Sequence, residues 1–284
     1  MRESLQDKID YSISLLRKAE KMALRLDPEN GFWLAFSGGK DSQALYHIAK
    51  MAGVKFKAHM NLTSVDPPEV IRFVKENYPD VELIKPKMNI YEMAKKKHIL
   101  PTMRFRWCCA EFKETGGLGN VTLIGIRKQE SARRSKRNEV ELGNHKFSGN
   151  FDQWSEHEEK IVACVGGKDK ILVSPIIYWT ERDVWEFLNE NGIPHCELYD
   201  QGYTRIGCIC CPMSGYRQKI REIKRWPHVK QNWIKTIQWM IDNGYSFFEN
   251  PNAEFGFRWW ISGKPFKEFY ADEVLQQKIE FNNE

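Results

Sequence analysis

The stretch "FSGGKDS", residues 36–42, directly follows the apolar run "FWLA" of residues 32–35. That run is short and flanked by glycines, which predicts a buried strand, and "SQALYHIAKMAG", residues 42–53, predicts a helix that Gly53 closes. Glycines let backbone amides approach a phosphate, and the N-terminus of the next helix presents unpaired N–H groups and the positive end of its dipole. The alternative is an ordinary glycine turn with a capping side chain. We expect phosphate binding by Ser37, Gly38, Gly39, Lys40, Asp41 and Ser42.

The segments after this loop alternate between strand and helix patterns. "KFKAHMNL" and "VELIK" predict strands on either side of a helix in "PPEVIRFVKENY", and "VTLIGI" and "KILVSPI" predict later strands. This alternation predicts an α/β fold, a doubly wound, mostly parallel sheet with ligands at the carboxyl ends of its strands.

Three regions are expected along the chain. Residues 1–30 predict an N-terminal helix, residues 31–212 a nucleotide-binding α/β domain that carries a cysteine cluster, and residues 213–284 a helical, Trp-rich extension packed on the core. Within the second region, residues 136–160 are polar and without clear periodicity, which predicts a long surface excursion.

Composition restricts the function classes only mildly. The 284 residues are 42% hydrophobic, enough for a core, and carry a net charge of +5, which permits a polyanionic partner without requiring one. The chain has no apolar run long enough for a membrane span, and its first residues are charged and periodic, unlike a secretory signal. We expect a cytoplasmic protein without membrane contact, and an oligomer is possible.

Five of the seven cysteines fall into two tight groups, the adjacent pair Cys108 and Cys109 and the triplet Cys208, Cys210 and Cys211. In an intracellular chain such groups favour metal ligands or reactive thiols over a disulfide framework. Four thiolates suit an iron–sulfur cluster or structural zinc, and their chemistry alone does not separate the two.

The motifs resemble those of a known family. "SGGKDS" resembles the pyrophosphate loop of the PP-loop ATP pyrophosphatases, which cleave ATP between its first and second phosphates and transfer AMP to an acceptor. Over about residues 31–215, successive blocks resemble the phosphoadenosine phosphosulfate (PAPS) reductase family: "SVDPPEVIRFVKENYPDVE", "RWCCAEFK", "GIRKQESARRSKR" and "PIIYWTERDVWEFLNENGIPHCELYDQGYTRIGCICCP". The resemblance implies an adenine nucleotide alpha hydrolase-like fold.

The resemblance also implies roles for single residues. It implies a [4Fe-4S] cluster, with zinc or metal-free thiols as the alternatives, held by Cys108, Cys109, Cys208 and Cys211. Cys210 is an extra thiol, which we interpret as passive rather than as a spare ligand or a persulfide acceptor. Because "G-x-R-x-x-E-S" matches a family block, Arg127 is expected in the active site with Lys40 and Asp41 as the catalytic residues.

Metal and phosphate contacts are expected around the same loop. Mg²⁺ bound near Asp41 would neutralise pyrophosphate charge, and Asp66 is a second candidate for metal or ribose contacts. The basic residues Arg134, Lys136 and Arg137 face either the nucleotide phosphates or the solvent.

Two departures from sulfonucleotide reductases narrow the expected function. Those reductases use a cysteine near the C-terminus as nucleophile, and no cysteine follows Cys211 here. Their version of the pyrophosphate loop is degraded, whereas the "SGGKDS" loop of this chain is intact, which favours ATP as the substrate. The ATP pyrophosphatases of DNA phosphorothioation systems share both features, which implies DNA as acceptor and a cysteine desulfurase as sulfur donor. The alternatives are a sulfonucleotide (APS or PAPS) reductase with an atypical thiol nucleophile and a non-catalytic nucleotide-binding partner protein.

The C-terminal tract allows two interpretations. Its lysines and arginines alternate with Trp226, Trp233 and Trp239, which suits contact with a nucleic-acid backbone and stacking on bases. The helical spacing of Trp233, Ile237 and Met240 equally suits core packing.

Overall fold

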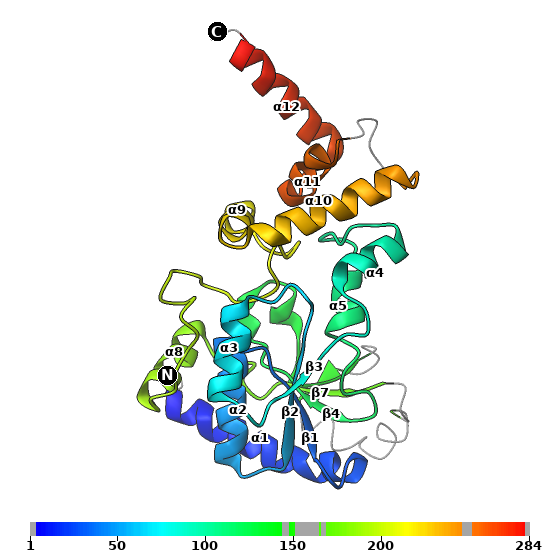
Figure 1. The fold of residues 1–284 in the computed structure, drawn as a ribbon. Helices are drawn as coiled ribbons and strands as arrows, with labels where there is room; N and C mark the ends of the chain where they lie inside the picture. Colours follow the sequence, from blue (N-terminus) through cyan, green and yellow to red (C-terminus); the bar gives the residue numbers. More distant parts are fainter. Residues whose placement is uncertain (1–3, 144–147, 151–164, 166–168, 246–251, 282–284) are drawn as a thin grey trace. The chain divides into compact units, whose positions relative to one another are not determined.

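The computed structural model describes residues 4–143, 148–150, 165, 169–245 and 252–281. Strands and helices alternate in its first part, and helices follow the last strand (Figure 1). In chain order the elements are α1 (Leu5–Leu26), β1 (Phe32–Ala35), α2 (Lys40–Ala52), β2 (Phe56–Asn61), α3 (Pro68–Asn77), β3 (Glu82–Ile84), α4 (Ile90–Lys97), α5 (Trp107–Phe112), β4 (Val121–Leu123), the 3₁₀ turns η1 (Lys128–Glu130) and η2 (Arg134–Lys136), β5 (Val140–Leu142), β6 (Ser148–Gly149), β7 (Ile171–Val173), α8 (Glu181–Glu190), α9 (Tyr216–Arg225), α10 (Pro227–Asp242), α11 (Ala253–Ser262) and α12 (Phe266–Phe281).

The strands of the described residues form one sheet in the order β3-β2-β1-β4-β7-β5-β6. β1 lies between β2 and β4 and is parallel to both, and the pairs β2–β3 and β4–β7 are parallel as well. The chain therefore runs outward from β1 to β3 and then returns to the other side of β1 as β4. This confirms the doubly wound, mostly parallel α/β fold. It also places a topological switch point, where such sheets bind ligands, at the carboxyl ends of β1 and β4.

The far edge of the sheet differs from the sequence-based expectation. β5 is antiparallel to β7, and β6 is antiparallel to β5. Val140 is fully buried and Leu142 nearly so, so the prediction of a surface excursion over residues 136–160 is wrong for this strand. A three-residue strand is too short to show a period in the sequence. Residues 144–147 and 151–160 of that stretch lie outside the described residues.

α1 and α2 carry residues at their ends that are typical of helix termini. α1 starts with a capping box between Ser4 and Asp7, and it packs against α2. α2 ends at Gly53, whose φ of +70° gives the left-handed C-cap that glycine adopts without strain. Leu16 and Ala19 of α1 and Ile48 of α2 are fully buried. Burial of these apolar side chains therefore stabilises the packing of both helices in the sheet unit.

Contacts divide the chain into two compact units. The sheet unit comprises residues 1–61, 68–85 and 115–206, and the helical unit comprises residues 62–67, 86–114 and 207–284. All the described strands belong to the sheet unit. The cysteine pair and triplet both belong to the helical unit, with the C-terminal helices. The domain boundaries at residues 30 and 212 that the sequence suggests stay a prediction, and the two compact units are a separate division, based on contacts.

The helical unit is built around tryptophan. Trp233 of α10 is 1% exposed and lies with ring centroids 4.9 Å from Tyr91 and 4.7 Å from Trp260. The core-packing interpretation is therefore confirmed for Trp233. Trp226 and Lys219 are buried as well, and Lys219 Nζ donates to the carbonyl of Ile261 over 3.0 Å. These residues are not available to a nucleic acid in this structure.

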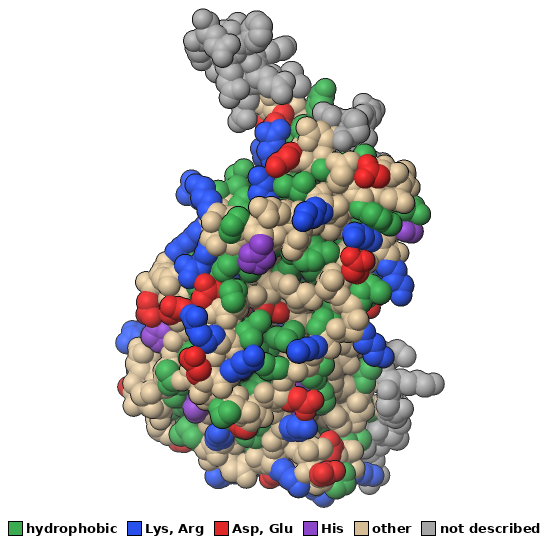
Figure 2. Space-filling model, viewed as in Figure 1, with side chains coloured by type: hydrophobic (Ala, Val, Ile, Leu, Met, Phe, Trp, Pro, Cys, Tyr) green, Lys and Arg blue, Asp and Glu red, His purple; other side chains and the backbone are tan. Residues whose placement is uncertain are grey.

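The surface gives little guidance by itself. Acidic and basic side chains are interspersed over the face shown in Figure 2, in keeping with the small net charge. Among the described helices, none combines the length and the apolar character that a membrane span requires.

Candidate functional site

The glycine-rich loop connects β1 to α2 at the switch point of the sheet. Gly38 has a φ of +71°, and a Cβ there would lie 2.8 Å from side-chain carbons of both Val70 and Val74 of α3. Only glycine fits this path without strain. Ser42 Oγ accepts from the amide of Ser37 over 3.1 Å and donates to the carbonyl of Gly39 over 2.9 Å. The loop is therefore held in shape across its own turn.

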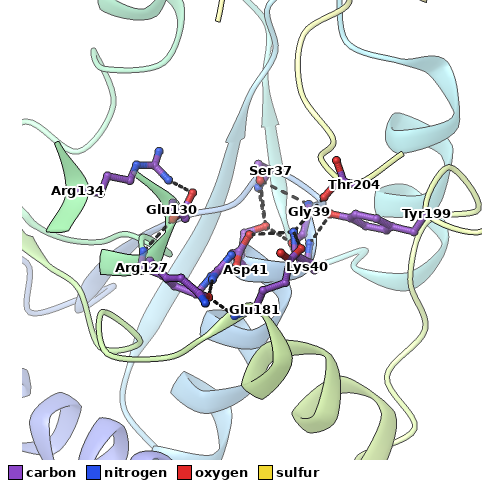
Figure 3. Close-up of polar contacts among 12 residues, drawn as sticks. Ser37, Gly39, Lys40, Asp41, Arg127, Glu130, Arg134, Glu181, Tyr199 and Thr204 are labelled. Atoms are coloured by element: carbon purple, nitrogen blue, oxygen red, sulfur yellow. Dashed lines mark hydrogen bonds and ion pairs between the residues drawn. The ribbon is translucent and has the colours of Figure 1, made fainter. Parts of the chain in front are cut away.

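Lys40 is the first residue of α2 and is only 5% exposed. Its Nζ donates to the carbonyl of Thr204 over 3.2 Å and lies 3.3 Å from Glu181 Oε1 and 3.7 Å from Asp41 Oδ2. Its backbone amide donates to the hydroxyl of Tyr199 over 2.9 Å (Figure 3). Both donors of this residue are thus engaged within the sheet unit.

Arg127 brings a second buried cation to the loop. It lies just beyond β4, is 4% exposed, and donates from Nε to Asp41 Oδ1 over 2.5 Å. Its own amide donates to Glu130 Oε1 over 2.8 Å, which fixes the backbone of the turn (Figure 3). A Cβ on Gly125 would lie 2.9 Å from the carbonyl oxygen of Asp41, so glycine at that position allows the close approach of the segment after β4 to α2. The structure thus brings Arg127 and Asp41 together, and their catalytic roles stay a prediction.

Three contacts in this site were missed from the sequence, those of Glu181, Tyr199 and Thr204. All three lie inside the long block "PIIYWTERDVWEFLNENGIPHCELYDQGYTRIGCICCP" that carried the family resemblance, and that block is the sequence signal that could have led to them. Burial raises the pKa of Tyr199 above its ordinary value, so its hydroxyl stays protonated at neutral pH.

The remaining basic candidates have different surroundings. Arg134 pairs with Glu130, and Arg137 pairs with the buried Glu141. Lys136 is exposed. Glu130 therefore connects the two arginines, because it pairs with the Arg134 guanidinium and accepts from the backbone amide of Arg127.

The site balances two cations against two carboxylates. Lys40 and Arg127 are neutralised by Asp41 and Glu181, next to the N-terminus of an α-helix. A polyphosphate bound there would lie near the ammonium of Lys40, the guanidinium of Arg127 and the positive end of the helix dipole. The arrangement suits binding and stabilisation of phosphate charge.

The four predicted cysteine ligands lie in the helical unit. Cys108 and Cys109 belong to α5, and Cys208 and Cys211 lie before α9; the side chains of all four are half-buried. The charges of Cys208 and Cys211 both affect the pKa of Cys108, so the two segments lie near each other. No group of three or more His, Cys, Asp or Glu side chains converges on a metal position among the described residues.

The vicinal pair is strongly polarised. The hydrogen bond that Cys108 donates, together with Arg106, whose Nη2 lies 3.2 Å from Cys109 Sγ, lowers the pKa of Cys109 below its ordinary value. The same bond to Cys109 raises the pKa of Cys108 above its ordinary value. The hydrogen bond therefore favours the thiolate form of Cys109 and the neutral thiol of Cys108.

Cys210 has the character of a packing residue. It is 2% exposed, has a φ of +58°, and its amide donates to Glu222 Oε2 over 2.7 Å. Burial and then the charge of Glu222 raise the pKa of its thiol to about 12. A thiol with this pKa is not a nucleophile near neutral pH, which fits the passive interpretation.

Asp66 belongs to the helical unit as well. Its carboxylate accepts from the amide of Thr63 over 2.6 Å and from the Thr63 hydroxyl over 2.9 Å, and that hydroxyl lies 3.3 Å from Cys208 Sγ. Asp66 thus orders the turn beside one of the cysteines. Its role in metal or ribose binding stays a prediction.

Residues 31–214, more than half of the chain, match the family model described as "Phosphoadenosine phosphosulfate reductase domain". The chain belongs to this family. One protein similar to it is an uncharacterized protein of Methanocaldococcus jannaschii, 26% identical over 242 residues, which cover 80% of this chain and 52% of that protein. Another is the adenosine 5'-phosphosulfate reductase of Lysinibacillus sphaericus, 27% identical over 166 residues, covering 56% of this chain and 62% of the reductase.

This member of the PAPS reductase family therefore spans about half the length of the first relative and about three fifths of the second. Among solved structures, the FMN adenylyltransferase of Candida glabrata is 16% identical, with a TM-score of 0.46 over 74% of this chain and 66% of that one. A likeness of that size carries no argument about function.

Proposed function

We propose that this chain is an ATP pyrophosphatase that adenylates an acceptor for sulfur insertion. The observation that carries the proposal is the intact "SGGKDS" loop at the N-terminus of α2, with Lys40 and Arg127 converging on Asp41. In the proposed reaction an acceptor oxygen attacks the α-phosphorus of ATP. The bond from that phosphorus to the α,β-bridging oxygen breaks, and pyrophosphate leaves with the bonding electron pair.

The residues of the loop fit the charge changes of this reaction. Negative charge accumulates on the leaving pyrophosphate, and the buried Lys40 and Arg127 are placed to neutralise it. Gly38 and Gly39 let backbone amides lie against the phosphates. Asp41, held between the two cations, orients both side chains before the nucleotide arrives.

The carboxylates present suit Mg²⁺, which is usually held by one or two carboxylates together with substrate phosphates. Asp41 would hold the ion, and its 23% exposed side chain leaves an oxygen accessible. When bound, the ion would neutralise pyrophosphate charge.

The donor set of the helical unit fits a [4Fe-4S] cluster in its chemistry, with zinc as the alternative. Cys108, Cys109, Cys208 and Cys211 supply four sulfur donors. The charge of Cys208 raises the pKa of Lys113, and the hydrogen bond to Cys109 raises the pKa of Arg106, so two cations lie beside these sulfurs. Cations beside thiolates favour a site that carries net negative charge. A bound cluster would supply redox or sulfur-transfer chemistry.

We propose the DNA backbone as the acceptor and a cysteine desulfurase as the sulfur donor. A backbone phosphate oxygen leaves poorly, and adenylation would turn it into a good leaving group that sulfur can replace. The intact loop, which is built for a substrate with a pyrophosphate, supports ATP rather than a sulfonucleotide.

A second candidate is sulfonucleotide reduction, because relatives of this chain include adenosine 5'-phosphosulfate reductases. A reductase needs a thiolate to take the sulfite group. Cys210 is a poor choice for this step, since its thiol is buried and its pKa lies near 12.

The deciding experiment measures pyrophosphate release from ATP and Mg²⁺ by anaerobically purified protein, with and without DNA. Lys40→Ala should abolish the release, whereas Lys50→Ala, an exposed lysine near the other end of α2, should keep it. A parallel reaction with a sulfonucleotide and thioredoxin measures sulfite. Sulfite without Lys40-dependent pyrophosphate would overturn the proposal in favour of reduction.

A further inference from the structure

The hydroxyl of Tyr199 accepts a hydrogen bond from a backbone amide that a phosphate-binding loop would use to bind a phosphate oxygen. The amide of Lys40 stands at the first turn of α2, where helical N–H groups have no partner within the helix. Here it donates to Tyr199 Oη over 2.9 Å. An N–H carries a single proton, so it cannot serve this phenol and a phosphate oxygen at full strength.

The ammonium of Lys40 is held by the same part of the chain. Its Nζ donates to the carbonyl of Thr204, five residues after Tyr199, and lies 5.6 Å from the centre of the Tyr199 ring. A Cβ on Gly39 would lie 3.4 Å from the Tyr199 hydroxyl, so the ring reaches directly over the loop. One segment, residues 199–204, therefore engages both polar groups of Lys40 (Figure 3).

Neighbouring rings hold Tyr199 in this position. Trp185 of α8 meets it edge-on with ring centroids 4.9 Å apart, and His195 lies at 6.1 Å. The backbone turns back on itself through bonds from the Tyr199 amide to the Cys196 carbonyl and from the Gly202 amide to the Tyr199 carbonyl. The hydroxyl is thus presented to the loop by a supported side chain.

We propose that Tyr199 is a latch on the nucleotide loop, a positioning residue whose hydroxyl takes the place of a phosphate oxygen on the Lys40 amide until nucleotide displaces it. This inference rests on the proposed function of the loop. Binding of a pyrophosphate group then exchanges one hydrogen bond for another and releases Tyr199. Because burial keeps the hydroxyl neutral, it yields to an anion that the dipole of α2 favours.

Tyr199→Phe tests the latch, since it removes the oxygen and keeps the ring. Without the competing hydroxyl, inorganic pyrophosphate should bind about fivefold more tightly in calorimetry, the effect of one neutral hydrogen bond. Residue-resolved hydrogen exchange of the free protein should show faster exchange of the Lys40 amide. Tyr270→Phe, which alters a half-exposed tyrosine of α12, should change neither quantity.

Weaker or unchanged pyrophosphate binding in Tyr199→Phe would overturn the latch, and weaker binding would mean that Tyr199 itself contacts the phosphate. Absence of pyrophosphate binding in both proteins would overturn it too. A thermal melt of each variant shows that the fold is intact. A wrong proposed function would give a different result: pyrophosphate release from ATP that depends on Lys40 would be absent. The binding and exchange measurements would still decide whether Tyr199 acts as the latch.

Discussion

Arg127 Nε and Asp41 Oδ1 lie 2.5 Å apart although 86 residues separate them along the chain. This ion pair joins the end of β4 to the start of α2 across the switch point of the sheet. It is therefore both a structural link between two central elements and part of the proposed catalytic site.

Asp41→Asn should separate these two roles. The change leaves the buried guanidinium of Arg127 without its counter-charge, and because Asp41 is partly exposed we expect a loss of about 2 kcal/mol in the free energy of unfolding, below the cost for a fully buried pair. Urea unfolding measures the loss. The double variant Asp41→Asn/Arg127→Met should regain part of this stability and still lack pyrophosphate release. Strictly additive losses would show that the pair does not couple.

Gly38→Ala should cost more stability than Gly53→Ala. Both glycines have φ near +70°, but a Cβ at Gly53 meets nothing within 4 Å, whereas at Gly38 it meets Val70 and Val74 at 2.8 Å. We expect about 1 kcal/mol for Gly53→Ala from the backbone alone. Crowding against α3 should add about 1–3 kcal/mol for Gly38→Ala. Equal shifts of the urea midpoints would contradict the close approach.

Cys208→Ser and Cys210→Ser are a matched pair two residues apart. If Cys208 is a cluster ligand, its loss should abolish the iron and acid-labile sulfide of anaerobically purified protein, while Cys210→Ser should keep both. Zinc in place of iron, lost in the same pattern, would favour the structural-zinc alternative. Metal retained by Cys208→Ser would remove this residue from the ligand set.

Stability should fall when the pH drops from about 6.5 to about 4. Burial, and then the charge of Lys50, lowers the pKa of His47 to about 4, so the unfolded chain binds a proton in this range and the folded chain does not. The stability is complete above the unfolded value, is lost progressively as the pH falls, and changes no further below about 4. Burial lowers the pKa of His59 as well, which adds to the same trend.

Urea midpoints of metal-free protein between pH 7.5 and 4.5 measure this slope. His47→Gln should flatten it, since glutamine does not titrate and its amide can still reach the Tyr78 hydroxyl that lies 3.2 Å from His47 Nε2. His228→Gln, at an exposed position of α10, should leave the slope unchanged. An equal slope in His47→Gln would assign the acid sensitivity elsewhere.

The sequence was most informative where local rules act. Glycines bound β1 and close α2, so the strand, loop and helix were predictable from residues 31–53 alone. Arg127 was predictable only through its family block, and its contact with Asp41 depends on the sheet order, which bonds β4 directly beside β1.

Long-range contacts escaped the sequence analysis. Tyr199 and Thr204 reach Lys40 from 159 and 164 residues away, and no periodic pattern marks such a contact. Lys219 is one of the lysines of the basic C-terminal tract, yet the fold buries it, and its ammonium donates to the Ile261 carbonyl. Charge at helical spacing does not reveal which lysines are exposed, because burial depends on how α9 and α11 pack.

The position of β1 inside the sheet, between β2 and β4, has a consequence for synthesis on the ribosome. When "SGGKDS" has just been translated, neither β2 nor β4, the strands that flank β1, has been made, and Arg127 follows Asp41 by 86 residues. Until Arg127 and Glu181 are made, Asp41 and the buried Lys40 lack these partners. The loop is therefore translated long before the residues that complete its surroundings, and the nascent chain carries "SGGKDS" for a long interval before the proposed site can form.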